Sequence, residues 1–233
     1  MRPIRSLLTL FLVGFCGNAL AQVTFEQPNE AVAGERLFDT CIFCHGNEAQ
    51  GNDRRDGPAL AGLPAWYIEL QMKNFRDGIR GGVAEDVPGQ VMYFTRGLMR
   101  DDATITRIAE YISGLEPGLP MAGNAVGARP YIWDSPYAGL DPSIEGDVTA
   151  GQQTYSTVCF ACHGADGTGN EALGAADLRY LSEIYMVRQL KYFRDGIRGA
   201  HPQDLGGRQM AVMSKMLTTD QAIADVIAYI STL

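Results

Sequence analysis

The sequence predicts an all-α protein made of two tandem copies of one small domain. The chain matches itself at a constant offset of 118 residues, and apolar residues recur at helical spacing near the end of each copy. No stretch of useful length alternates apolar and polar residues as a strand does. The repeat therefore favours two small domains over one large one.

The repeat extends over most of each copy. Across residues 41–115, roughly a third of the aligned pairs are identical without a gap, which is far beyond chance. The longest identical run, Phe-Arg-Asp-Gly-Ile-Arg-Gly, lies at 75–81 and 193–199. Upstream, the copies need an adjustment of one residue, because Gly34 lies seven residues before its first cysteine and Gly151 lies eight.

Three short helices are predicted in each copy. A first helix should lead into a cysteine pair, and a second is expected at about 65–77 and 184–195, stopped by the glycine that follows. Thr218 with Gln221 resembles a capping box at the start of the last helix. The apolar face of that helix is Ile105, Ile108, Ala109, Ile112 and Leu115, matched by Ile223, Val226, Ile227, Ile230 and Leu233. Domains this small bury little apolar surface unaided, so a large apolar cofactor would complete each core.

Residues 1–21 predict a secretory signal peptide, with two arginines, an apolar run and a small-residue end. We expect cleavage after Ala21 and export to the periplasm. The run from Leu7 to Phe15 is too short to span a bilayer, and no later stretch approaches the roughly 20 apolar residues that spanning needs, so we expect no stable membrane insertion. A lipid anchor at Cys16 is the alternative, but Phe15 stands where such signals want a small residue.

The mature chain divides into a first domain at 22–115, a linker at 116–147 and a second domain at 148–233. The linker is rich in glycine and proline. It also contains three aromatic residues, Tyr131, Trp133 and Tyr137. Since a freely flexible tether would be small and polar, we expect the linker to pack across the domains.

The charge of the chain is acidic. Its formal net charge is −8, and removal of a leader with two arginines and no acid makes it −10. This charge argues against nucleic acid and anionic membranes as partners, and it permits docking to a redox protein with a basic patch. The other interpretation is that the acidic charge serves only to keep the protein soluble.

The motif that carries chemistry is Cys-x-x-Cys-His, which occurs once in each copy. Two thiols three positions apart can each reach one vinyl group of the same porphyrin, and the adjacent His can turn its imidazole to the iron. A single Cys-x-x-Cys could be a redox dithiol or half a zinc site, but two copies followed by His in an exported chain favour haem. The predicted residues are Cys41, Cys44, Cys159 and Cys162 for attachment of two covalent haem c groups, and His45 and His163 as iron ligands.

A methionine in register is the candidate ligand for the other face of each haem. Under the offset only Met92 and Met210 coincide, and each lies 47 residues after its His, in an expected loop long enough to reach that face. A core-filling role is the alternative for any methionine. The third histidine, His201, aligns with Val83, so ligation by it would break the repeat, and we expect a surface or supporting role.

Two arginines, Arg80 and Arg198, also recur in register. They could pair with haem propionates, because a guanidinium forms strong charge-assisted hydrogen bonds with carboxylates. They could equally be solvated charges at the end of a helix.

These motifs resemble the class I cytochromes c, in the two-domain, dihaem arrangement of the c-four type. The resemblance covers nearly the whole mature chain. It includes the aromatic-x-x-x-Gln-hydrophobic segments at 67–72 and 185–190, the Phe-x-x-Gly-x-Arg that follows each, and the methionine before the last helix. The resemblance implies a helical fold around each haem, His and Met as axial ligands, and electron transfer as the function.

One segment departs from that family. The Gly-Pro-Ala-Leu at 57–60 resembles the segment whose proline carbonyl accepts a hydrogen bond from the proximal His, whereas 175–178 reads Ala-Ala-Asp-Leu. The carbonyl of Ala176 can still serve. We nonetheless expect the second imidazole to be held less rigidly and the potential of its haem to be the more easily shifted.

The predicted function is that of a single-electron carrier between respiratory partners, a donor and a terminal oxidase or reductase, and not that of an enzyme. Ligation by His and Met closes both axial positions of the iron. One alternative is a dihaem subunit of a membrane oxidase or dehydrogenase complex. Another is a dihaem peroxidase, which would need an open coordination position.

Overall fold

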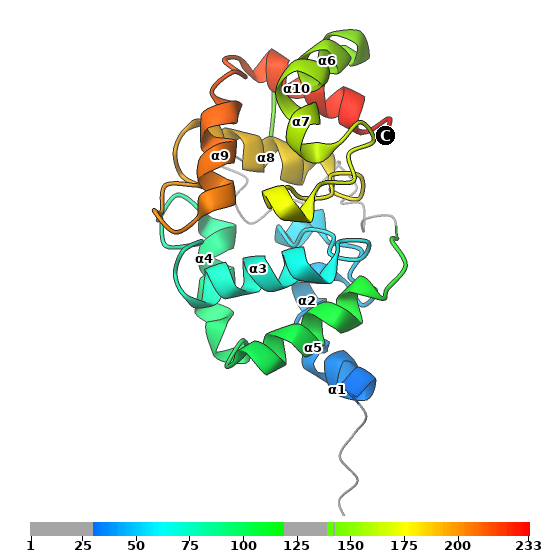
Figure 1. The fold of residues 1–233 in the computed structure, drawn as a ribbon, viewed down its shortest axis with the longest axis vertical. Coiled ribbons are helices and arrows are strands. Elements are labelled where there is room, and N and C mark those ends of the chain that lie inside the picture. Colours follow the sequence, from blue (N-terminus) through cyan, green and yellow to red (C-terminus); the bar gives the residue numbers. More distant parts are fainter. Residues whose placement is uncertain (1–29, 119–138, 142) are drawn as a thin grey trace, which may run out of the picture.

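The computed structural model describes residues 30–118, 139–141 and 143–233 (Figure 1). The predicted signal peptide at 1–21 and the three aromatic linker residues lie outside this part of the chain. Among the helices that are described, none is long and apolar enough to cross a membrane.

The regular structure of the described residues is helical, which confirms the predicted all-α class. Within them, extended pairing is limited to two isolated bridges. The first domain contains α1 (Glu30–Phe38), α2 (Ile42–His45), η1 (Asp53–Arg55), α3 (Ala65–Arg76), α4 (Val87–Phe94), η2 (Thr95–Leu98) and α5 (Asp102–Ser113). The second contains α6 (Val148–Thr154), the π-helix η3 (Tyr155–Cys159), α7 (Phe160–His163), η4 (Glu171–Leu173), α8 (Glu183–Arg194), α9 (Leu205–Ser214) and α10 (Asp220–Ile230).

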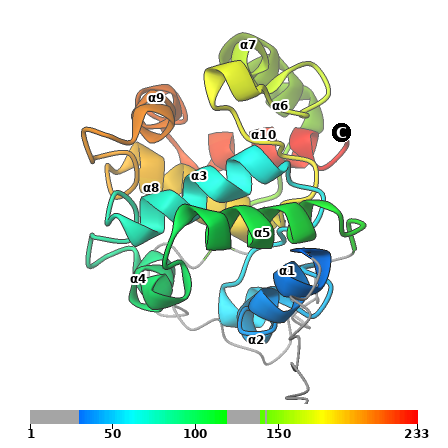
Figure 2. The same cartoon turned by 60° about the horizontal axis from the view of Figure 1, so that its bottom comes forward.

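The first and last helices of each domain pack together to form its core. Helix α1 packs against α5, as Figure 2 shows, and α6 packs against α10. The predicted apolar faces are confirmed within the last helices, where the following side chains are buried: Ile105, Ile108, Ala109, Ile112, Ile223, Val226, Ile227 and Ile230. Leu115 and Leu233, which were predicted to complete these faces, lie beyond the helix ends, and Leu233 is exposed. Leu181 packs against the cores of both domains, which joins them through apolar contact.

The start of α10 lies one residue after the predicted capping box. Thr219 is the N-cap, and its hydroxyl accepts a hydrogen bond from the backbone N–H of Ala222 at 3.1 Å. The predicted pairing of Thr218 with Gln221 is therefore wrong. The side chain of Gln221 instead donates to the carbonyl oxygen of Glu145 at 2.7 Å, which ties the end of the linker to the second domain.

Helices α3 and α8, which correspond to the predicted second helix of each copy, are each stopped by a glycine two residues after their last residue, as predicted. Gly78 and Gly196 have φ values of 73° and 78°, so each takes the left-handed conformation that stops a helix. Beyond these glycines the structure contains α4 and α9, where the sequence had predicted a loop around each in-register methionine. An aspartate caps each of these helices, since Asp86 accepts from Gly89 N–H at 3.0 Å and Asp204 accepts equivalently.

The one-residue difference between the copies is absorbed by a π-helix. In the second domain the chain from Tyr155 to Cys159 winds with the wider π turn, directly before the Cys-x-x-Cys-His motif. A π turn accommodates one more residue than an α turn, so the extra residue does not disturb the flanking helices. Gly34 and Gly151 both keep their places against the last helix of their domain.

We expect Gly151→Ala to destabilise the folded haem-bound protein by at least about 2 kcal/mol. A Cβ at this position would lie 1.9 Å from the backbone carbonyl oxygen of Asp225, so α6 and α10 would have to move apart. Denaturant unfolding measures the loss. The matched control is Gly97→Ala, where a Cβ would meet nothing within 4 Å, and an equal loss in both variants would contradict this account of the helix contact.

Candidate functional site

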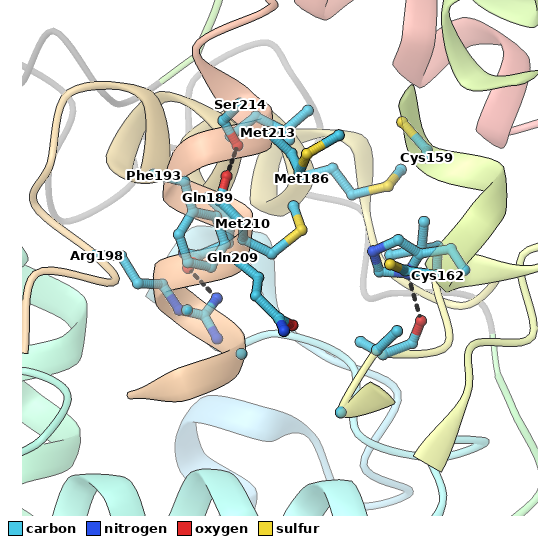
Figure 3. A pocket seen from close by; sticks show the side chains of 18 of the residues that line it. Cys159, Cys162, Met186, Gln189, Phe193, Arg198, Gln209, Met210, Met213 and Ser214 are labelled. Carbon is cyan, nitrogen blue, oxygen red and sulfur yellow. Dashed lines mark hydrogen bonds between the residues drawn. The ribbon is translucent and has the colours of Figure 1, made fainter. Parts of the chain in front are cut away.

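The Cys-x-x-Cys-His motif of the second domain borders a large, mainly apolar cavity. Cys159 ends the π-helix, and Cys162 and His163 lie on α7. The cavity encloses about 1260 Å³ including its open mouth. Figure 3 shows Cys159 and Cys162 on one side of the cavity and α9 with Met210 and Met213 on the other. The cavity thus brings together the four residues that the sequence predicted for this site.

The proximal imidazole of the second domain is oriented by a backbone carbonyl. Nδ1 of His163 lies 2.8 Å from the carbonyl oxygen of Ala176. Because a carbonyl oxygen only accepts, Nδ1 carries the proton and Nε2 keeps its lone pair for a metal. Burial is the main cause that lowers the pKa of His163, against the opposing effects of this hydrogen bond and of Asp177, so the imidazole is neutral at pH 7.

The first domain repeats this arrangement. Nδ1 of His45 lies 2.9 Å from the carbonyl oxygen of Pro58, and burial lowers the pKa of this imidazole too. The hydrogen bond in the second domain is therefore as short as the one in the first, although Ala176 replaces the proline. The expectation that the second imidazole is held less rigidly finds no basis in these distances.

The two in-register methionines have different described surroundings. Met210 lines the cavity of the second domain, together with Met213 and Met186. Met92 lies on α4 and packs with the cluster of Phe75, Met99 and Ile105, so its described contacts are with that cluster rather than with His45. The structure brings the predicted ligands together around one cavity in the second domain.

Arg80 and Arg198 meet at the boundary between the domains. The side-chain oxygen of Gln189 accepts from Arg198 at 2.6 Å and from Arg80 at 3.2 Å, and that of Gln71 accepts from Arg80 at 2.9 Å and from Arg198 at 3.0 Å. Both arginines are buried, with exposed fractions of 8% and 7%. The interpretation as solvated helix-end charges is therefore wrong, because each arginine lies against the other domain.

These two guanidiniums have no carboxylate partner among the described residues. Their Nε atoms are buried without a hydrogen-bond acceptor. Burial alone would raise the pKa of the nearby Tyr185 hydroxyl, but the charges of Arg80 and Arg198 outweigh it and the pKa is lowered. Burial disfavours the charge of Arg80, but the nearby Tyr185 and Asp86 outweigh it and raise its pKa. The two Nε donors without an acceptor still leave this boundary able to bind a further negative group.

The residues present fit a covalent haem. The cavity in the second domain supplies two thiols, a neutral imidazole with a free nitrogen and a thioether on the opposite side. Arg198 also lines this cavity, so its guanidinium is available to an acidic group of a bound ligand. Burial raises the pKa of Cys159 to about 11, so its thiol is protonated before a thioether forms.

Sequence reasoning missed the glutamines that join the arginines. Gln71 and Gln189 occupy the same place in the repeated aromatic-x-x-x-Gln-hydrophobic segment, so their register was the available signal. His201 lies outside the haem-sized cavity, and its Nδ1 accepts from the backbone N–H of Gln203 at 3.3 Å. This position agrees with the supporting role expected for His201.

The known proteins that this chain resembles in sequence and in structure include c-type cytochromes. A family model described as cytochrome c matches residues 31–116 and 148–233. The chain is 29% identical over 209 residues to cytochrome c-552 of Acidithiobacillus ferridurans, covering 88% of this chain and 78% of that protein. It is 28% identical over 230 residues to a thiosulfate dehydrogenase electron acceptor of Thiomonas intermedia, covering 97% and 91%. A solved structure of Acidithiobacillus ferrooxidans cytochrome c4 superposes with a TM-score of 0.58 at 26% identity, covering 84% of this chain and 99% of that one.

Proposed function

The chain belongs to the cytochrome c family, and we propose that it moves single electrons between protein partners in the periplasm. It is a dihaem electron carrier, with one covalent haem c held by the cysteine pair of each domain. The observation that carries the proposal is the cavity of the second domain, where thiols, imidazole and thioether lie around one space. When bound, the haem supplies an iron that exists in ferrous and ferric states.

The axial ligands of this proposal are His45 with Met92 and His163 with Met210. In each pair the neutral imidazole held by a backbone carbonyl would offer Nε2 to the iron, and the methionine would supply a thioether sulfur. Two protein ligands to each iron would leave no coordination position for a substrate, which favours a carrier over an enzyme such as a peroxidase. Met92 and Met210 remain the candidates because the repeat aligns no other methionine pair.

Arg80 and Arg198 are proposed to bind haem propionates. Their buried Nε atoms have no acceptor, and neither guanidinium forms an ion pair with a described carboxylate. A propionate at this place would supply both, through charge-assisted hydrogen bonds. Because each arginine also contacts a glutamine of the other domain, the same residues would hold the propionates and the domains together.

The proposed partners are a redox donor and a terminal oxidase or reductase. The predicted signal peptide supports a periplasmic location. One relative is named a thiosulfate dehydrogenase electron acceptor, so a thiosulfate-oxidising enzyme is a donor that can be tested directly. Mixing thiosulfate dehydrogenase and thiosulfate with the oxidised protein should then reduce it, and the absence of reduction would exclude that donor.

Mass spectrometry of protein matured with the haem-attachment machinery tests the proposed carrier first. We expect a chain that begins at Gln22 with two haem additions. Coulometric reduction of the same sample should take up two electrons per chain, because each iron accepts one. A single haem, bound zinc or an uptake other than two electrons would contradict the proposal.

A further inference from the structure

Among the many positions at which the two copies differ, two lie in contact with each other across the domain boundary. Asp56 stands where the second copy has Gly174, and Arg188 stands where the first copy has Leu70. Nη1 of Arg188 lies 2.6 Å from Oδ1 of Asp56, and the two side chains are 2% and 3% exposed. Between described residues, no other ion pair joins the two copies.

The backbone of Asp56 adopts a conformation that costs free energy for any residue with a side chain. Its φ is 56°, in the left-handed region, and Gly174 takes the same conformation in the second copy with φ of 66° at little cost. A glycine would therefore satisfy this loop. What Asp56 adds is its carboxylate, and that carboxylate contacts Arg188.

Asp56 belongs to the loop that orients the first proximal imidazole. Two residues further on, the carbonyl oxygen of Pro58 accepts the hydrogen bond from His45. Gly57, the residue between Asp56 and Pro58, lies directly against the backbone of Cys44, since an added Cβ there would lie 2.0 Å from the Cys44 carbonyl oxygen. The carboxylate is thus close enough to influence the first haem site.

The guanidinium of Arg188 comes from the other domain. Arg188 lies on α8, whose Tyr185 lines the cavity of the second haem, but Arg188 itself is not among the lining residues. Nη2 of Arg188 also donates a hydrogen bond to the backbone carbonyl oxygen of Asp56 at 3.4 Å. Nearby, the hydroxyl of Ser182 donates to the carboxylate of Asp53 at 2.7 Å, so two contacts from the second domain hold the same loop.

We propose that Arg188 of the second domain positions the proximal loop of the first haem through Asp56 and balances its charge. The potential of the first haem then depends on a side chain of the second domain. This inference rests on the proposed function, since it requires one haem in each domain. An unbalanced anion beside a haem favours the ferric state, and an unbalanced cation favours the ferrous state, so the two partners have opposite effects.

Redox titration of the haem-bound variants tests the proposal. Asp56→Asn retains the shape and tolerates the left-handed backbone, and it should raise the first potential because Arg188 stays charged. Arg188→Met should lower the first potential. The double variant Asp56→Gly with Arg188→Leu places the residues of the opposite copy at both positions, so it should fold and return the first potential towards wild type. Arg188→Lys, which keeps the charge, should rescue most of the shift.

The assignment of each potential comes from Met92→His and Met210→His backgrounds, which mark the first and second haem. Arg194→Gln is the matched control, because Arg194 also lies on α8 but pairs with Asp220 inside the second domain. It should leave the first potential unchanged. Shifts of the same sign in Asp56→Asn and Arg188→Met, or a larger shift at the second haem in Arg188→Met, would overturn the proposal.

Failure of this inference differs from failure of the proposed function. Two haems that titrate normally, with no response of the first potential to either partner, would reject the role of the ion pair alone. Fewer than two haems in the wild-type protein would reject the proposed function on which it rests.

Discussion

Replacing Met210 by His should lower the midpoint potential of the second haem, and Met92→His should do the same for the first. Thioether sulfur is a soft ligand that favours ferrous iron, whereas imidazole stabilises ferric iron better. Covalent attachment should be intact in both variants, because the cysteines are untouched. Spectroelectrochemical titration of each purified variant measures the shift, and we expect the haem of the unaltered domain to change far less.

The weak charge-transfer absorption from methionine to ferric iron gives a second readout. Each single variant should lose about half of this band, and the double variant should lose it all, because each methionine contributes one iron–sulfur bond. The controls are Met213→Leu and Met99→Leu, since Met213 lines the same cavity and Met99 packs beside Met92. Loss of the band in a control, with retention in its partner, would show that the ligand is not the methionine in register.

Arg198→Met should destabilise the haem-bound protein by about 3–5 kcal/mol, which is the usual loss when one partner of a buried ion pair is removed. The propionate proposed to pair with Arg198 would be left buried without a cation, and Gln189 would lose its 2.6 Å hydrogen bond. The methionine side chain is similar in length to that of arginine but uncharged, so the change chiefly removes the charge. Denaturant unfolding of the ferric protein measures the loss.

The control for this prediction is Arg194→Gln, which removes a more exposed arginine that pairs with Asp220. It should cost much less, because solvent screens that pair. If Arg198→Met is instead as stable as wild type or more stable, the guanidinium was an uncompensated buried charge in the haem-bound protein. Its assignment to a propionate would then be wrong.

The features that the sequence predicts well are those that the repeat or local chemistry determines. The offset of 118 residues aligned the haem motifs and both helix-ending glycines, and helical spacing identified the buried faces of α5 and α10. The carbonyl of Ala176 was also expected as an acceptor, because a backbone hydrogen bond does not depend on the side chain. These predictions need only local sequence or the comparison of two copies.

The missed features depend on tertiary contacts or on unfavourable local propensity. Helix α4 contains Pro88 and Gly89 at its start, and α9 contains two glycines, so the sequence of neither region predicts a helix. Burial of Arg80 depends on the other domain, which no periodicity within one copy reveals. The contact of Asp56 with Arg188 could not be predicted from the repeat, because both residues stand at positions where the two copies differ.

The central claim is that two haems with closed His and Met ligation carry one electron each. A redox titration of the wild-type protein, followed by visible absorption, tests it most directly. We predict two one-electron transitions per chain, low-spin spectra in both oxidation states and the methionine charge-transfer band in the ferric protein. A high-spin ferric haem without that band would contradict the claim, because it would leave an axial position open to substrate.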